Sequence, residues 1–308
     1  MAPVVVDSLD ARDSTIALLN GHLPQALSLQ RRLHFMRFPG GSTEHSHVLF
    51  CTDPEKPWGA GDAPRHFAAA YLDFSRAPET PMWLYSTLEE DSTLSEAEVQ
   101  EVLDLVYAIL RHVKAEAARY PGKLHRENGV MIGGLHEGTR QLLLARGITT
   151  ETYYNPHDKW LFQVSELPTG LKSPLTDDMK WDTVRREDCD LIVSSTKVPK
   201  AERTLLTLPS TVLRLGDGTP ISWGFLGVDG TLSTLHCEVP WRGRGIAKAV
   251  AIKTIQEHSK DFADDGWASA DVHPDNLQSQ GVCRSIGGKK AWRNAWTVVD
   301  YASIADSS

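Results

Sequence analysis

The apolar residues of this chain recur with two periods, three to four residues in some segments and two in others. The clearest helical pattern follows Ser95-Glu-Ala-Glu98, which has the spacing of a capping box. Apolar side chains then continue on one face through Val102, Val106 and Ile109. This pattern predicts an amphipathic helix that begins just after Ser95.

Similar patterns predict the other elements of both halves of the chain. In the first half, we expect helices over Ser14 to Arg32 and near Thr139 to Arg146, and strands near His47 to Cys51, His66 to Asp73, Met82 to Tyr85, Gly129 to Ile132, Ile148 to Tyr154 and Trp160 to Val164. In the second half, we expect helices near Trp181 to Ser194, Lys200 to Thr207, Ile246 to His258 and Leu277 to Ile286, and strands near Ser210 to Leu215, Ile221 to Leu226, Thr231 to Cys237, Trp267 to Val272 and Trp292 to Tyr301. Hairpin strands followed by a strand-helix-strand unit indicate the α/β class, with a mixed sheet.

A segment rich in proline and glycine divides the chain into similar halves. Residues 166–176 break both periods, because they contain two prolines and one glycine. We therefore expect a first domain over residues 1–165, a linker over 166–178 and a second domain over 179–308. A length of 308 residues is sufficient for two domains of ordinary size.

Composition and charge narrow the class of protein. A formal charge of −8 gives no general attraction to nucleic acid or acidic membranes, so neither is expected as a partner. No apolar run approaches the ~20 residues of a membrane span, and the first fifteen residues carry acids instead of a basic leader. The four cysteines (Cys51, Cys189, Cys237, Cys283) lack CxxC spacing, which favours reduced thiols and a cytoplasmic location.

A glycine-rich turn stands between the strand that ends at Cys237 and the helix that begins at Ile246. It reads Arg242-Gly243-Arg244-Gly245-Ile246-Ala247. Small residues let a ligand approach the backbone, and a helix N-terminus presents unpaired N–H groups to an anion. Two arginines add bidentate donors for phosphate oxygens. The turn therefore predicts an anion site.

In this context the turn resembles a motif of the GNAT superfamily of acyl-CoA N-acyltransferases. The pattern appears as Arg242-x-x-Gly245-x-Ala247, and Asn276-x-x-Ser279 then leads a helix that ends at Ile286-Gly287-Gly288. The chain is similar in particular to the glycine N-acyltransferase-like branch. That closer similarity rests on three features: Gly218-Thr-Pro-Ile-Ser-Trp-Gly224, the spacing from Gly230 to Arg242, and Leu23-Pro-Gln-Ala-Leu27. The resemblance implies a tandem fold with a degenerate N-terminal half and a complete, catalytic C-terminal half.

The resemblance also implies where acetyl-CoA or another acyl-CoA would bind. Backbone N–H groups of the turn would hold the pyrophosphate, and the strand backbone near Cys237 and Val239 would pair with the pantetheine arm. The residues expected to bind the cofactor are Cys237, Val239, Arg242, Gly243, Arg244, Gly245, Ile246, Ala247, Asn276 and Ser279.

Acyl transfer needs a base for the amine, and an acid for the departing thiolate assists it. Members of the branch carry a glutamate directly after the glycine that begins this strand, whereas here Thr231 follows Gly230. Candidate bases are, in order, His236, Glu238 and His273. Strand alternation would place the first two on one face with Thr234.

The remaining candidates concern the acid and the acceptor. The tyrosine that usually serves as the acid is replaced by Cys283, which either donates a proton or is buried by packing. Thr234, Trp223 and His273 are expected to contact the acceptor.

Two further patterns have simpler explanations. His45-x-His47 has no third metal ligand nearby in sequence, so an exposed polar face explains it and no metal is expected. The acidic run Glu89-Glu90-Asp91 occupies the first-half position equivalent to the Arg242 turn, and its carboxylates would repel a pyrophosphate. The first half is therefore expected to have a structural role.

Together these features predict an acyl-CoA-dependent N-acyltransferase. It would transfer an acyl group, acetyl or another small one, to the amine of a small molecule or amino acid within a ternary complex. Three alternatives stay open: a coenzyme A-binding protein without catalysis, acylation of protein lysines, and acylation of an alcohol. The acceptor, the acyl length and the oligomeric state are left open.

Overall fold

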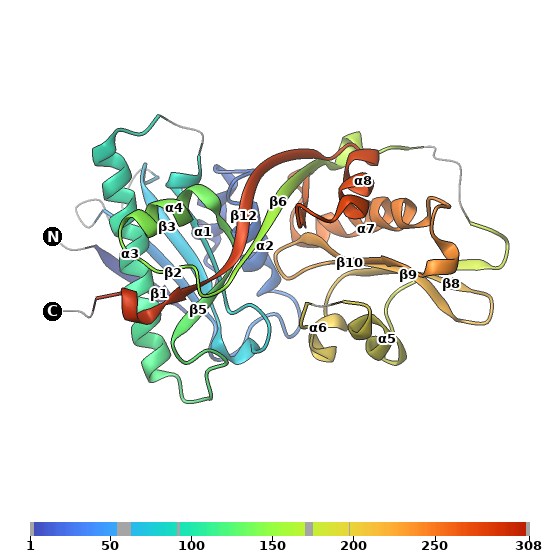
Figure 1. Ribbon diagram of the computed structural model, residues 1–308, viewed down its shortest axis with the longest axis horizontal. Helices are drawn as coiled ribbons and strands as arrows, with labels where there is room; N and C mark the ends of the chain where they lie inside the picture. The colour runs from blue at the N-terminus through green and yellow to red at the C-terminus, as the bar shows by residue number, and fades with distance from the viewer. Residues whose placement is uncertain (1–2, 54–62, 91–92, 170–174, 197, 306–308) are drawn as a thin grey trace. The chain divides into compact units, whose positions relative to one another are not determined.

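The structure is a computed structural model that describes residues 3–53, 63–90, 93–169, 175–196 and 198–305 (Figure 1). The chain forms two compact units, each described by itself below. The first comprises Met1–His157 together with Arg293–Ser308, and the second comprises Asp158–Trp292. Among the described residues, no helix is both long and apolar enough to cross a membrane.

The first unit contains a mixed sheet. Its strands, in spatial order, are β1 (Val4–Ser8), β2 (His47–Thr52), β3 (Phe67–Leu72), β4 (Met82–Ser86), β5 (Gly129–His136) and β12 (Lys289–Asp300). All neighbours are antiparallel except β4 and β5. The helices of this unit are α1 (Asp13–Asn20), α2 (Leu27–Phe35), α3 (Glu96–Arg119) and α4 (Glu137–Ala145).

Helix α3 connects the parallel strands β4 and β5 and supplies much of the core of the first unit. Its apolar face, with Val106 and Ile109, packs in one cluster with Leu49 of β2 and Ala70 of β3. The predicted capping box at Ser95 is confirmed. Ser95 Oγ accepts a hydrogen bond from the Glu98 N–H (3.3 Å), and Glu98 Oε2 accepts one from the Ser95 N–H (2.8 Å).

The second unit repeats this plan. Its strands, in spatial order, are β6 (Tyr154–Gln163), β11 (Trp267–Val272), β10 (Thr231–Cys237), β9 (Pro220–Leu226), β8 (Ser210–Leu215) and β7 (Met179–Asp182). Only β10 and β11 are parallel, and α7 (Ile246–Phe262) connects them. Helices α7 and α8 (Leu277–Ser285) cover one face of the sheet, and α5 (Cys189–Ser194) and α6 (Glu202–Leu205) lie on the other (Figure 1).

The two halves exchange their last strands. Strand β6 follows α4 of the first half but pairs with β11, whereas β12 follows α8 of the second half but pairs with β5. The compact units therefore divide within β6, between His157 and Asp158, and within β12, between Trp292 and Arg293. This division differs from the boundaries expected around residues 166–178, because sheet pairing and not the proline-rich segment defines the units.

Most elements agree with the hydrophobic pattern, and β8, β10 and β11 have the predicted bounds. The helix expected over Ser14 to Arg32 is divided into α1 and α2, with Pro24, which has no N–H to donate, between them. The helix expected over Trp181 to Ser194 is wrong in its first part, which belongs to β7 and the turn after it. There Arg214 binds two carboxylates, those of Asp182 (2.6 Å) and Asp188 (2.8 Å), which holds the segment against β8.

Two further differences concern strands. The strand expected near Ile148 to Tyr154 is wrong, because residues 148–153 form no strand, and the one expected near Trp160 to Val164 begins earlier, as β6 (Tyr154–Gln163). Strand β1 was not predicted, because its three consecutive valines show no alternation of apolar and polar residues.

Candidate active site

The glycine-rich turn of the second unit has the backbone conformation of an anion site. Gly243 and Gly245 have φ values of +75° and +81°, in the left-handed region that favours glycine. A β-carbon at either position would meet nothing within 4 Å, so conformation and not space requires glycine there. Gly245 is the N-cap residue of α7.

The N-terminus of α7 has no side-chain cap. Gly245 has no side chain to accept a hydrogen bond, and the first turn contains no acidic residue. The Ala249 N–H donates to the Gly245 carbonyl (3.0 Å), so helical geometry leaves the N–H groups of residues 246–248 without an intrahelical acceptor. These groups and the helix dipole favour a bound anion.

Both arginines of the turn are anchored and exposed. Arg242 Nε donates to the Cys237 carbonyl (2.9 Å), which ties the turn to the end of β10. The Arg244 guanidinium lies 4.8 Å from the centre of the Trp241 ring and donates to the Pro240 carbonyl (3.2 Å). Each guanidinium has five N–H donors, so these bonds leave donors for phosphate oxygens.

Helix α3, the equivalent helix of the first unit, differs from α7 in its cap and in the charge of the residues around its N-terminus. Helix α3 is capped by Ser95, and its first turn carries Glu96 and Glu98. In the acidic run before it, Glu89 accepts a hydrogen bond from the Ser86 N–H (3.1 Å), and Glu90 accepts one from the Tyr85 hydroxyl (2.9 Å). Asp91 lies outside the described residues. A capped helix beside carboxylates is a poor anion site, which supports a structural role for the first unit.

The parallel strands β10 and β11 diverge next to the turn. Their register covers only Thr231 opposite Ser269 and Leu232 opposite Ala270. Both strands continue past these pairs and remain paired with β9 and β6 on their other edges. Beyond Leu232 and Ala270, the facing backbone edges are therefore available to an extended ligand that pairs as a strand would.

A β-bulge changes which side chains of β10 share a face. Ser233 lies opposite Phe225 and His236 opposite Trp223, so one extra residue is inserted in β10, and Thr234 has φ +53°. The expected alternation of Thr234, His236 and Glu238 is therefore wrong at Thr234. Ser233 takes its place on the face of His236, because residues directly opposite in an antiparallel pair share a face.

This face is the one opposite α7. A β-carbon at Gly224 would lie 3.2 Å from Val250 Cγ1 of α7 and 3.3 Å from Leu235 Cδ1. Gly224 and Leu235 therefore face α7. Trp223 precedes Gly224 in β9 and points the other way, and His236 stacks on it.

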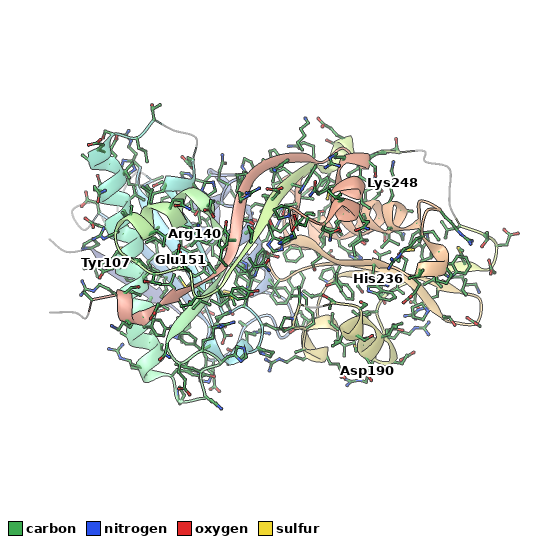
Figure 2. The ribbon with its side chains drawn as sticks, in the orientation of Figure 1. Tyr107, Arg140, Glu151, Asp190, His236 and Lys248 are labelled. Carbon is green, nitrogen blue, oxygen red and sulfur yellow. The ribbon has the colours of Figure 1, made fainter. Side chains whose placement is uncertain are left out.

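His236 is suited to accept a proton. Its position in the second unit is labelled in Figure 2. Its ring stacks on Trp223 with centroids 4.6 Å apart and planes at 17°, and Nε2 lies 3.6 Å from Glu238 Oε1. Burial lowers the pKa of His236 below its ordinary value and the charge of Arg242 lowers it further, against the opposing effect of Glu238. The imidazole is therefore neutral at neutral pH, as a general base requires.

Three buried hydroxyls lie along the same face of β10 and β11. Thr231 and Ser233 are two residues apart, and Thr231 pairs with Ser269. Their oxygens are buried and have no hydrogen-bond partner within the described chain. Buried polar atoms are normally satisfied, so these hydroxyls mark an unsatisfied polar strip where β10 and β11 begin to diverge. Sequence reasoning missed Ser233, because the bulge leaves no mark in the sequence, and Ser269, because its pairing with Thr231 joins strands distant in sequence.

The structure gives local explanations for three other predicted site residues. Asn276 Oδ1 accepts a hydrogen bond from the Ser279 N–H (3.0 Å), so Asn276-x-x-Ser279 is the N-cap of α8. His273 is 40% exposed, and its Nδ1 accepts a hydrogen bond from the Asp275 N–H (3.2 Å) in the turn after β11.

The two cysteines among the predicted residues are both buried. Cys283 is 3% exposed, and burial raises its pKa to about 12, which favours the packing interpretation over that of an acid. The Cys237 side chain packs in an apolar cluster with Ile246 and Val250, whereas Val239 is exposed. At these two positions only the backbone of Cys237 and Val239 fits the expected role.

Two αβ units of the same plan, with diverging parallel strands in the second beside an uncapped helix N-terminus, define a tandem GNAT-fold acyltransferase. The chain belongs to the family described as the acyl-CoA N-acyltransferase verG N-terminal domain, whose model matches residues 3–166. The matched residues make up just over half of the 308 in the chain. No curated protein matches the chain.

Solved structures share the fold at low sequence identity. A Drosophila protein is 14% identical, with a TM-score of 0.65 over 96% of this chain and 98% of its own. A tandem GNAT protein from the clavulanic acid biosynthesis pathway is 10% identical, with a TM-score of 0.55 over 99% of this chain and 100% of its own. A GCN5-related N-acetyltransferase from Kribbella flavida is 12% identical, with a TM-score of 0.51 over 76% of this chain and 86% of its own.

Proposed function

We propose that the second unit transfers an acyl group, acetyl or another small one, from acyl-CoA to the amine of a small molecule or amino acid. Both substrates would be bound together, and transfer would be direct. The observation that carries this proposal is the uncapped N-terminus of α7 beside the diverging edges of β10 and β11. The first supplies donors for a pyrophosphate, and the second supplies free backbone groups for an amide-containing arm.

In this proposal, the donor is held by the turn and the adjacent strand. The N–H groups of residues 246–248 and the guanidinium groups of Arg242 and Arg244 bind the phosphate oxygens. The β10 backbone near Cys237 and Val239 pairs with the pantetheine amides. Asn276 and Ser279 contribute through the N-terminus of α8, whose first N–H groups are only partly used by the cap.

The chemistry exchanges one bond and moves one proton in two steps, from the amine to the base and from the base to the thiolate. The neutral amine attacks the thioester carbon, so that a C–N bond forms and the C–S bond breaks. His236 takes the proton from the amine and returns it to the departing thiolate. A backbone N–H at the bulge around Thr234 polarises the carbonyl. Binding both substrates in one site supplies the orientation that such a reaction needs.

Glu238 and His273 remain candidate bases after His236, in that order. His236 is favoured because it is half-buried, stacked on Trp223 and neutral. Trp223 supports the acceptor site through this stacking, and Ser233 adds a hydroxyl on the same face. Thr234, which the sequence predicted to contact the acceptor, contributes to the site through its backbone.

Membership of the glycine N-acyltransferase-like branch is also part of the proposal. The two-unit plan with one capped and one uncapped helix supports it. The segment Gly218 to Gly224 that suggested the branch forms the β8–β9 turn and the start of β9, where Gly218 has φ +92°. The geometry of the hairpin therefore also accounts for the similarity of this segment to the branch. Membership of the branch would favour an amino acid as the acceptor, but the proposed reaction does not depend on it.

One observation favours a second candidate, a protein that binds coenzyme A without catalysis. Thr231 stands where the branch carries its glutamate and is 5% exposed, and Cys283, at the position of the usual acid, is also buried. Neither position supplies the expected acid or base. Catalysis by the proposed acyltransferase then depends on His236, or on another residue of the same strand, as the base.

A thiol-release assay separates the two candidates. Incubation of the full chain with acetyl-CoA and a panel of primary amines, including glycine, is expected to release free coenzyme A in proportion to an N-acetylated product detected by mass spectrometry. A panel of alcohols serves as the matched control and should give no ester. Binding of acetyl-CoA without amine-dependent release would support the second candidate, and absence of binding would contradict both.

A further inference from the structure

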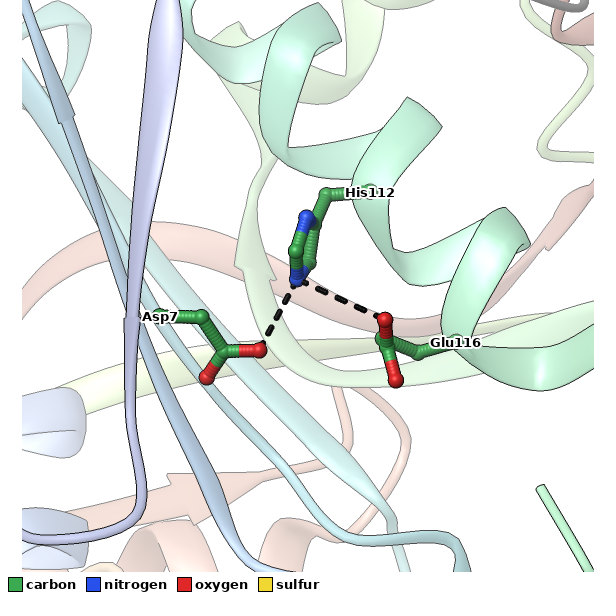
Figure 3. Close-up of side chains that lie close together, drawn as sticks. All are labelled: Asp7, His112 and Glu116. Carbon is green, nitrogen blue, oxygen red and sulfur yellow. Dashed lines mark hydrogen bonds and ion pairs between the residues drawn. The ribbon is translucent and has the colours of Figure 1, made fainter. Parts of the chain in front are cut away.

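A cluster of three potential metal ligands and one adjoining histidine lies in the first unit, whereas the candidate active site belongs to the second. It joins Asp7 of β1, His47 of β2, and His112 and Glu116 of α3 (Figure 3 shows three of them). Asp7 Oδ2 lies 2.9 Å from His47 Nδ1 and 2.9 Å from His112 Nε2. His112 Nε2 lies 3.9 Å from Glu116 Oε1.

The fold brings these residues together from distant parts of the sequence. His112 and Glu116 are four residues apart on α3 and therefore share a face. Asp7 pairs with Leu49 across β1 and β2, and Leu49 belongs to the core beneath α3. Asp7 and His47 consequently point to the α3 side, at the edge where the apolar core ends.

The donor set suits a divalent transition-metal ion. Imidazole nitrogens and carboxylate oxygens are ligands of Zn²⁺ and similar ions. One donor atom each from Asp7, His112 and Glu116 lie within 4.8 Å of one another. Donors around a tetrahedral Zn²⁺ are about 3.3 Å apart, given bonds of ~2.0–2.1 Å. The separations of 2.9 and 3.9 Å lie on either side of this value.

The cluster is sheltered and rich in negative charge. Its four side chains are only 17–26% exposed. The Glu116 carboxylate pairs with Arg119, whose Nη1 lies 2.7 Å from Glu116 Oε1 and whose side chain is 71% exposed. The Asp7 carboxylate accepts hydrogen bonds from both imidazoles, which fixes its position beside His112.

We propose that Asp7, His112 and Glu116 bind one divalent transition-metal ion of the Zn²⁺ kind, and that His47 holds the Asp7 carboxylate in place by its hydrogen bond. The ion replaces the proton that His112 shares with Asp7 and fastens the edge strand β1 to α3. Its role is structural, because its ligands come from β1 and α3 and so link two elements of the first unit. The sequence predicted no metal, because His45-x-His47 has no third ligand nearby in sequence, and Asp7 and His112 are 105 residues apart.

Calorimetric titration of the full chain with Zn²⁺ alone tests the proposal. The wild type is expected to bind one equivalent, and the variants H112A and E116Q are expected to weaken binding by about 10-fold to 100-fold. H258A is the matched control, because His258 also bonds a carboxylate of its own helix, Asp261 (3.0 Å), and should leave binding unchanged. Absence of binding, or equal binding by H112A and the wild type, would overturn the proposal.

Two further measurements distinguish a built site from loss of folding. R119A removes the cation that competes for Glu116 and is expected to retain or tighten Zn²⁺ binding, so a loss of binding in R119A would contradict the ligand assignment. Zn²⁺ should raise the melting temperature of the wild type and of H258A but not that of H112A, since a ligand stabilises only the state that binds it. A rise of equal size in H112A would also overturn the proposal.

Discussion

Replacing Arg242 and Arg244 together by alanine is expected to weaken acetyl-CoA binding about 100-fold or more. Hydrogen bonds to charged groups contribute about 1.5–3 kcal/mol each, so the loss of two corresponds to at least this factor. The substitution also removes the bond from Arg242 Nε to the Cys237 carbonyl, which holds the turn against β10. The N–H groups of α7 remain and should retain weak binding.

Calorimetry on the double variant needs a control for net charge. Lys260 and Lys289 are exposed residues of the same unit, outside the turn, and their double alanine variant removes the same two positive charges. We expect this control to bind acetyl-CoA within about threefold of the wild type, because exposed charges at a distance are screened by salt. Unchanged binding by the Arg242 and Arg244 variant would show that the turn does not hold the donor.

Replacing His236 by alanine is expected to lower kcat about 100-fold to 10,000-fold, the usual range for a general base. The KM for acetyl-CoA should change little, since His236 is not among the donor-binding residues. Burial lowers the pKa of His236, so the neutral, proton-accepting form prevails above a pKa that lies under the ordinary value. Wild-type kcat/KM should therefore fall as pH decreases through this lowered pKa, and the variant should lose that acidic limb.

Glu238→Gln is the informative companion to this variant. The negative charge of Glu238 raises the pKa of His236, so its removal should shift the acidic limb to lower pH while kcat stays near that of the wild type. The reverse result, a large loss in Glu238→Gln and a small one in His236→Ala, would make Glu238 the base.

Local features of the fold could be predicted from the sequence. The capping box at Ser95 and the strands β8, β10 and β11 were predicted correctly, because each depends on residues close in sequence. The glycine-rich turn was equally predictable, since two positive φ values need glycine.

Long-range features could not be predicted in this way. The exchange of β6 and β12 depends on which neighbouring strand each of them pairs with. Hydrophobic periodicity predicts a strand but not its partner. The bulge that replaces Thr234 by Ser233 on the face of His236 arises from pairing with β9. The carboxylate of Asp7 lies beside His112 although 105 residues separate them, so no spacing rule could join them.

Hydrogen-deuterium exchange with and without acetyl-CoA tests most directly whether the donor binds at the N-terminus of α7. In the free protein, the N–H groups of residues 246–248 have no intrahelical acceptor and should exchange rapidly. We predict that acetyl-CoA slows exchange in peptides covering residues 242–249 and leaves those covering 95–101, at the start of α3, unchanged. Protection at the start of α3, or no protection at α7, would contradict the account.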